Sequence, residues 1–213
     1  MGQVELAWTP PGDAATSLVF NTNETPGVFR GLANVDRATN ITPGGTAVTT
    51  VHSGFRQYRV EFRGIRKFVD RALYGALTEW VAHVLEGGKF SFAYDSGKKF
   101  SSTLLAQVNQ GANEIFTVAT PSAVAVDDWI WLRHPTLLTR FAAAAATAVD
   151  TGAKKITLGH NLKRTFPSGS LVTHLDYIPL AVILEDESPL LERPAPNGAG
   201  LHDLAFTVRA VTS

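Results

Sequence analysis

The stretch that decides the fold begins with RQYRVEFR, residues 56–63, where apolar and charged residues alternate almost without interruption. Successive side chains of a β-strand point to opposite faces, so this alternation predicts a strand whose apolar face carries Tyr58, Val60 and Phe62. The opposite face carries mostly charged residues. The pattern therefore indicates a strand that is buried on one side and faces water on the other.

The hydrophobic period then changes. In FVDRALYGALTEWVAHVLEGG, residues 68–88, apolar residues recur at helical spacing, and we expect an amphipathic helix over residues 66–86 that ends at Gly87-Gly88. Gly75 inside this helix suggests close approach by a neighbouring backbone, because glycine costs about 1 kcal/mol in a helix interior. KFSFAY, residues 89–94, returns to strand alternation. The helix should therefore pack on a sheet.

The remaining sequence favours a mainly β (α+β) protein with two domains. We expect a β-sandwich or split-barrel domain from residues 1–100 and 176–213, which includes the helix, and a small inserted β-barrel-like domain from residues 101–175. Short strand patterns at 8 to 12-residue spacing suggest the small barrel, and strand patterns of first-domain character at residues 178–184 and 201–211 indicate that it is inserted. The expected strands of the insertion are Leu104–Val108, Glu114–Val118, Asp128–His134, Thr136–Ala142, Lys155–Leu158 and Ser170–Leu175.

Composition excludes several classes of protein. The chain has 213 residues, 45% of them hydrophobic, with 19 basic and 19 acidic residues and no cysteine. The absence of cysteine excludes disulfides, thiolate metal sites and cysteine nucleophiles. Zero net charge gives no overall attraction to nucleic acid or to a membrane surface. No apolar run reaches the roughly 20 residues that span a bilayer, so we expect no membrane partner.

The search for catalytic motifs finds none with the required spacing. The sequence contains no phosphate-binding loop, dinucleotide fingerprint or nucleophile elbow. The histidines lack metal-ligand spacing, and His174 with Asp176 has no third ligand or serine partner. We therefore expect a protein that is not an enzyme, with no cofactor, no metal site and no catalytic residue.

Two clusters remain as candidate contact sites. The first is basic and could face either nucleic acid or an acidic neighbour such as residues 185–187, although a solvated strand face is the alternative interpretation. Its candidate interface residues, with the acidic segment, are Arg56, Arg59, Arg63, Arg66, Glu185, Asp186 and Glu187. The second cluster is Trp129 and Trp131, which share one strand face. Exposed, they could bind a partner or stack on a sugar; packing in the small domain is the alternative.

Several of these motifs resemble a known family. The run from Phe55 to Ile65, the helix with Leu77-Thr78-Glu79-Trp80, and the run from Gly87 to Asp95 are similar to the distal tail (baseplate hub ring) proteins of long-tailed bacteriophages. Residues 154–158 and 166–172 also resemble a recurring tail-protein pattern.

The resemblance implies a structural protein of the virion tail, assembled in the host cytoplasm. It implies a self-associating ring, typically a hexamer, that joins the tail tube protein to the tail-tip or hub proteins. The ring would surround a lumen through which DNA passes. The Gly/Pro-rich segments 9–13, 40–46 and 189–200 could serve as arms that reach a neighbour. Two alternatives stay open: a tail tube or terminator subunit, and a carbohydrate-binding module that uses Trp129 and Trp131.

Overall fold

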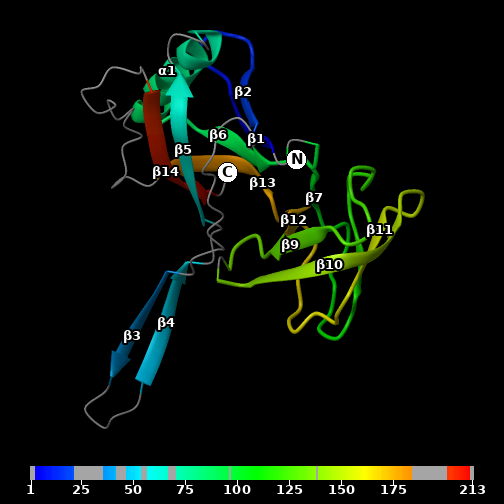
Figure 1. Ribbon diagram of the computed structural model, residues 1–213. Coiled ribbons are helices and arrows are strands. Elements are labelled where there is room, and N and C mark those ends of the chain that lie inside the picture. Colours follow the sequence, from blue (N-terminus) through cyan, green and yellow to red (C-terminus); the bar gives the residue numbers. More distant parts are fainter. Residues whose placement is uncertain are drawn as a thin grey trace. The chain divides into compact units, whose positions relative to one another are not determined.

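The structure, a computed structural model, describes residues 3–21, 36–41, 47–53, 57–66, 71–95, 97–137, 139–183 and 201–211. Within these ranges the protein has fourteen strands and one helix, which confirms the mainly β fold class with a single helix (Figure 1). The chain divides into two compact units. The first consists of Met1–Ala33, Arg56–Ser96 and Ile178–Ser213, and the second of Asn34–Phe55 and Gly97–Tyr177. The second unit contains the segment that we expected as an insertion, but it also takes residues 34–55, which we expected in the first domain.

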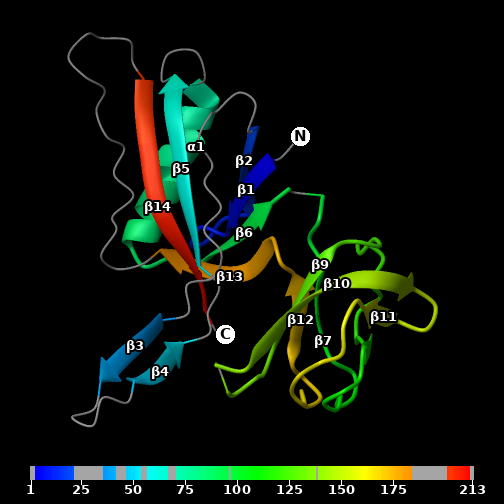
Figure 2. The ribbon, with the colours of Figure 1, turned by 60° about the horizontal axis from the view of Figure 1, so that its bottom comes forward.

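The first unit is built on an open six-stranded sheet, called here the open sheet (Figure 2). Its strands come from both ends of the chain, because β13 and β14 return after the second unit and lie beside β6 and β5. In order across the sheet they are β2 (Thr16–Asn21), β1 (Gln3–Trp8), β6 (Phe90–Tyr94), β13 (Tyr177–Ile183), β14 (Leu201–Ala210) and β5 (Gln57–Arg66).

The helix α1 covers one face of this sheet and spans Arg71–Leu85. Our expected start at residue 66 is wrong, because β5 continues to Arg66 and that residue pairs with Leu201 of β14. Residues 67–70 lie outside the described part. The error arises because Ile65 breaks the alternation of Tyr58, Val60 and Phe62 but fits the spacing of the helix, whereas β5 continues through a register shift opposite His202 and Leu204.

The end of α1 follows the expected glycine signal. Gly87 has a φ of 80°, the Gly88 amide donates to the His83 carbonyl at 2.9 Å, and the Gly87 amide donates to the Val84 carbonyl at 2.9 Å. These bonds form a Schellman motif. The expectation for Gly75 is wrong: a Cβ added there would meet nothing within 4 Å, so no backbone approaches it closely.

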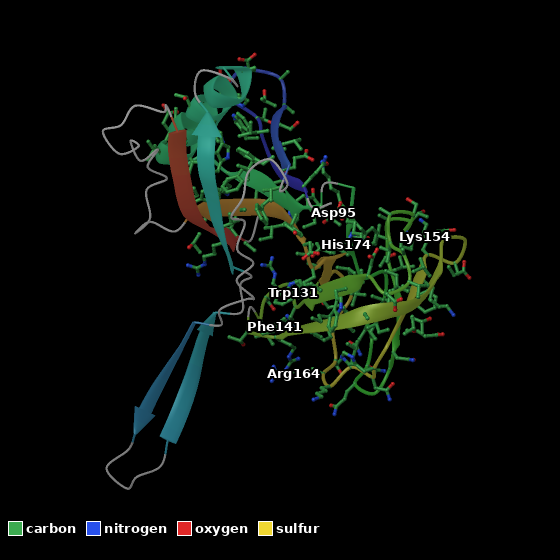
Figure 3. All side chains as sticks on the ribbon, viewed as in Figure 1. Asp95, Trp131, Phe141, Lys154, Arg164 and His174 are labelled. Atoms are coloured by element: carbon green, nitrogen blue, oxygen red, sulfur yellow. The ribbon has the colours of Figure 1, made fainter. Side chains whose placement is uncertain are left out.

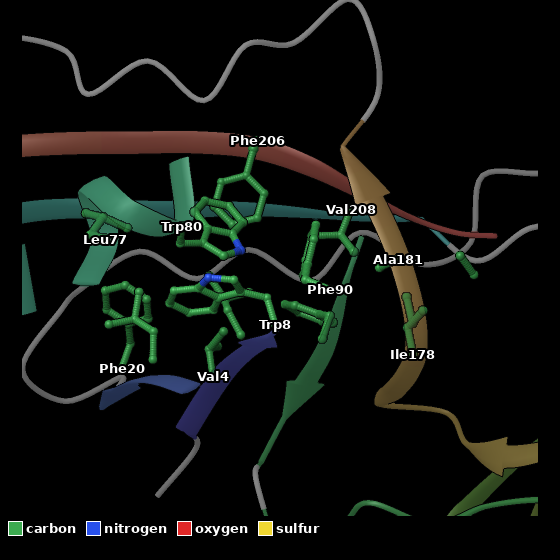
Figure 4. Packing of buried hydrophobic residues seen from close by; sticks show 14 residues of the cluster. Val4, Trp8, Phe20, Leu77, Trp80, Phe90, Ile178, Ala181, Phe206 and Val208 are labelled. Atoms are coloured by element: carbon green, nitrogen blue, oxygen red, sulfur yellow. The ribbon is translucent and has the colours of Figure 1, made fainter. Parts of the chain in front are cut away.

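The core of the first unit lies between α1 and the open sheet, as Figure 4 shows. Trp80 of α1 is fully buried, with Phe90 of β6 in an edge-on contact at 5.3 Å and Phe206 of β14 tilted at 4.8 Å. In the described part of the chain the buried Trp80 Nε1 has no hydrogen-bond partner. Trp80 therefore stabilises the unit through apolar and aromatic contact rather than through its N–H group.

The register of β14 supports the predicted face of β5. Val60 pairs with Phe206, and Tyr58 pairs with Val208. Directly opposite residues of an antiparallel pair share one face of the sheet, and Phe206 and Val208 are both fully buried. The side chains of β5 themselves lie outside the described part.

The second unit contains a curled six-stranded sheet, called here the barrel. Its first and last strands meet: the Leu105 amide donates to the Phe116 carbonyl at 2.8 Å, and the Val118 amide donates to the Thr103 carbonyl at 2.9 Å. Its strands in order are β7 (Ser101–Thr103), β12 (Leu171–His174), β9 (Trp129–Arg133), β10 (Phe141–Asp150), β11 (Lys155–Leu158) and β8 (Glu114–Phe116).

Small and large side chains alternate across the interior of the barrel. Ala144 of β10 lies opposite Ile130 of β9, and both are fully buried. The register of β10 then shifts between Ala146 and Ala148, where the strand leaves β9 and continues along β11. A small barrel needs such small interior residues and such a bulge to curl tightly.

Two expected strands of the insertion are wrong, and two strands were not expected. Leu104–Val108 has only isolated bridges at its two ends, and Thr136–Ala142 is mainly a turn, because β10 begins only at Phe141. The unexpected strands are β7 and β3 (Asp36–Ile41), and β3 pairs with β4 (Ala47–Ser53) in a separate two-stranded sheet. The expected arm at residues 40–46 falls on the connection of this hairpin, of which residues 42–46 lie outside the described part.

Candidate functional site

The predicted basic cluster lies on a strand at one edge of the open sheet. Arg59, Arg63 and Arg66 belong to β5, and the described part of the chain shows β5 bonded to β14 alone. Their side chains lie outside the described part. Arg56 and the acidic residues Glu185, Asp186 and Glu187 also lie outside it. The pairing between basic and acidic residues therefore stays a prediction.

The opposite edge of the open sheet has a different chemistry. It is formed by β2, which pairs with β1 and contains no charged residue. Leu18 and Phe20 of β2 are buried in the core, whereas Val19 between them is 44% exposed. The open sheet thus presents one uncharged edge and one arginine-bearing edge.

The two predicted tryptophans differ in exposure although they lie on one strand face. Trp129 is 52% exposed, whereas Trp131 is 3% exposed. Both alternate along β9 with Ile130 and Leu132, which fill the interior of the barrel. The Trp131 ring stacks on Phe141 of β10, with centroids 4.7 Å apart and planes at 16° (Figure 3). Only Trp129 has the accessible surface that a partner or a sugar needs.

The most connected polar group next to these tryptophans is a cluster of three side chains, called here the Asp128 cluster: Asp128, Lys98 and His174. Asp128 Oδ1 lies 2.5 Å from Lys98 Nζ, and Asp128 Oδ2 lies 3.1 Å from His174 Nε2. The Ala125 amide also donates to Asp128 Oδ2, at 2.9 Å. Asp128 directly precedes β9, whereas His174 ends β12, so the cluster joins segments 46 residues apart.

The hydrogen bonds set the protonation state of the His174 ring. The Phe100 amide donates to His174 Nδ1 at 3.2 Å, so Nδ1 must carry the lone pair and Nε2 carries the proton that is donated to Asp128. The side chain of His174 is 3% exposed. A His–Asp pair can serve as a general base when the second ring nitrogen faces a substrate. Here that nitrogen, Nδ1, accepts a hydrogen bond from the Phe100 amide, and the buried ring is closed to substrate.

The electrostatics of Asp128 agree with a structural role. Burial alone would raise the pKa of this carboxyl, but the hydrogen bonds from Lys98, the Ala125 amide and His174 outweigh burial and hold the pKa below its ordinary value. Asp128 therefore stays ionised at neutral pH with its acceptors occupied. The cluster ties the segment that enters the barrel at Lys98 to β9 and β12.

Sequence reasoning considered His174 but missed the Asp128 cluster. The expected neighbour of His174 was Asp176, two residues away, whereas the ring bonds to Asp128 through a strand pairing that brings distant segments together. No spacing rule connects residues 98, 128 and 174. The position of Asp128 directly before a strand pattern was the only local signal.

The described residues contain no group of three or more side chains placed to hold a metal ion. Within the same residues, no helix has the length and the apolar content that a membrane span requires. No protein-family model matches the chain, and a search of curated proteins finds no match.

Proposed function

We propose that the protein is a ring-forming structural subunit of a phage or phage-like tail, of the distal tail (hub) type, which joins the tail tube to the tail tip. The resemblance of residues 55–65, 77–80 and 87–95 to that family suggests the role. The observation that carries it is the open sheet with two unlike edges. The proposal includes a location in the virion tail, contacts with tube and tip proteins, and a lumen that DNA crosses.

The two edges favour a head-to-tail contact between copies. An exposed strand edge presents unpaired backbone groups that can bond to another strand. If β5 of one copy pairs with β2 of the next, the same contact repeats from copy to copy and forms a ring when the rotation between copies closes. Pairing β5 with β5 would bring three arginines of each copy together with only one acidic residue, Glu61, per strand, and like charges that lie opposite each other destabilise a sheet. The uncharged β2 carries no such penalty.

The β3–β4 hairpin gives independent support. In the described part of the chain its two strands pair only with each other. An isolated two-stranded hairpin is marginally stable in water at best, and a third strand or an apolar surface is needed to hold it. A neighbouring subunit in a ring would supply that surface.

Negative-stain imaging of the purified full-length protein tests the proposal. We expect closed rings, which a head-to-tail contact through unlike edges can form, with about six copies as the family resemblance implies. Open stacking into tubes would instead support a tail tube or terminator subunit. A field of single subunits at high protein concentration would contradict the proposal.

Two matched variants of one exposed residue test the edge contact itself. Val19→Lys places a positive charge on β2, where it would face the arginine strand of the neighbour, whereas Val19→Glu places a negative charge there. We expect rings to be lost in the lysine variant and kept in the glutamate variant. Equal behaviour of the two variants would contradict the pairing of β2 with β5.

A carbohydrate-binding role is the second candidate, and the exposure of Trp129 favours it. An aromatic ring with an open face can stack on a sugar. Binding to a glycan array that disappears with Trp129→Ala would support this role. Absence of binding by the unaltered protein would remove it.

A further inference from the structure

The turn between β9 and β10 is closed by a histidine ring. His134 Nδ1 lies 3.0 Å from the Leu137 backbone nitrogen and 3.2 Å from the Thr136 backbone nitrogen, and the Thr136 hydroxyl lies 3.3 Å away. The His134 amide donates to the Arg140 carbonyl at 3.0 Å, and the Arg140 amide donates to the Leu137 carbonyl at 2.8 Å. Residues 134–140 are called here the His134 turn.

The direction of these bonds requires a neutral ring. Backbone N–H groups can only donate, so His134 Nδ1 must present its lone pair to Thr136 and Leu137, and the ring proton must reside on Nε2. A proton on Nδ1 would point at the same two N–H groups. Both bonds would then be lost, and the new positive charge would face two donors.

The surroundings of His134 also disfavour its charged form. The residue is 9% exposed, and the charged group that faces it is Arg140, on the far side of the same turn. Burial first, and the Arg140 guanidinium second, lower the pKa of His134 below its ordinary value. Among the described residues, no carboxylate forms an ion pair with His134, so nothing there compensates the charge.

We propose that His134 is a pH-responsive lock on the β9–β10 turn, which is closed while the ring is neutral and opens when Nδ1 is protonated. Opening frees the Thr136 and Leu137 amides. It also releases the part of the turn that carries Leu137, whose residue surface is already 48% exposed. In acid the His134 turn therefore opens at the surface of the barrel, while the interior residues of the barrel keep their positions.

The sign of the pH dependence follows from the lowered pKa. The open turn exposes an ordinary imidazole with a pKa of about 6.5, so the open form binds the proton more tightly than the closed form. The closed turn is therefore most stable above about pH 6.5 and loses stability as the pH falls below that value.

Amide hydrogen exchange of the full-length protein, read by NMR and corrected for intrinsic exchange rates, tests the lock. We expect the protection of Thr136 and Leu137 to fall with pH by up to about tenfold per unit in the acid range, because one proton is taken up on opening. The imidazole of His134 and both amides should titrate with one common midpoint below about pH 6.5. Protection that is independent of pH, or separate midpoints, would overturn the proposal.

Variants separate the lock from a general effect of acid. His134→Asn keeps an oxygen acceptor that can bond the same amides, as asparagine does in Asx turns, but it does not titrate. We expect this variant to retain protection at all pH values, and His160→Asn, which alters an exposed histidine of another loop, to behave like the unaltered protein. A pH dependence that persists in His134→Asn would overturn the proposal. If that variant does not fold, the common midpoint in the unaltered protein decides.

Discussion

The two six-stranded sheets of this protein differ in whether their edge strands are paired. The barrel joins its first strand to its last through backbone hydrogen bonds at Leu105 and Val118, so its two edges pair with each other within one chain. The open sheet ends in β2 on one side and β5 on the other, each bonded to a single neighbour in the described part. Closure leaves the barrel without an open edge, whereas β2 and β5 of the open sheet are the edges through which the proposed contact between copies would form.

The two sheets also differ in what stabilises them. The open sheet depends on one large apolar contact, between Trp80 of α1 and the aromatic residues of β6 and β14. The barrel adds a buried polar group, the Asp128 cluster, which ties three distant segments. The comparison teaches that the first unit should respond mainly to changes of side-chain volume, whereas the barrel should respond to changes of charge at Asp128 as well as to changes of volume.

The largest expected effect concerns the first unit. Trp80→Ala should lower its free energy of unfolding by about 3–5 kcal/mol, because a fully buried aromatic side chain is lost and a cavity remains. Trp80→Phe should cost less than half as much, because the ring contacts are largely kept and the unpartnered Nε1–H is removed. Chemical denaturation followed by circular dichroism measures both. Equal losses in the two variants would contradict a role based on ring contact.

The barrel should respond to the charge of Asp128. Asp128→Asn should destabilise it by about 2–3 kcal/mol, because the charge-assisted bonds from Lys98 and His174 are lost or reversed. Asp127→Asn is the matched control: this neighbour is exposed, has a φ of 70°, and asparagine tolerates that conformation. Similar losses in both variants would show that the Asp128 cluster has no special role.

The pH dependence of the same unit sharpens this test. The pKa of Asp128 is lowered in the folded protein, so its contribution to stability is present above about pH 4 and is lost as the pH falls through the folded-state pKa. The free energy of unfolding of the unaltered protein should fall more steeply in this acid range than that of Asp128→Asn. Parallel curves would contradict the prediction.

The smallest expected effect is on the outer face of the barrel. Trp129→Ala should change the free energy of unfolding by less than about 0.5 kcal/mol, because the side chain is half exposed. Trp131→Ala should cost several times more, because its ring is buried against Phe141. Thermal unfolding of the two variants compares them directly. A large loss for Trp129→Ala would show that its ring is part of the packing.

The sequence predicted elements well wherever one hydrophobic period persisted. The pattern at residues 155–158 coincides with β11, and Gly87-Gly88 mark the end of α1 because only glycine takes the positive φ there without strain. The alanine run of β10 could not be assigned in this way. Alanine disfavours strands, and only the narrow interior of the barrel, opposite Ile130, makes it the suitable residue.

The candidate site was harder to predict because it depends on pairing between distant strands. The shared face of Trp129 and Trp131 follows from alternation, but their unequal burial does not. The expected strand Thr136–Ala142 covers most of the turn at residues 134–140, because threonine favours strands, whereas the ring of His134 closes the turn. The Asp128 cluster, likewise, exists only once β12 lies beside β9.

The most direct test of the account is the mass of the full-length protein in solution, measured by sedimentation equilibrium over a wide range of concentration. If the proposed ring forms between copies, the protein should reach one closed assembly, of about six chains as the family resemblance implies, and its mass should stop increasing once the ring is complete. A protein of 22.9 kDa that remains monomeric at the highest concentration would contradict the account.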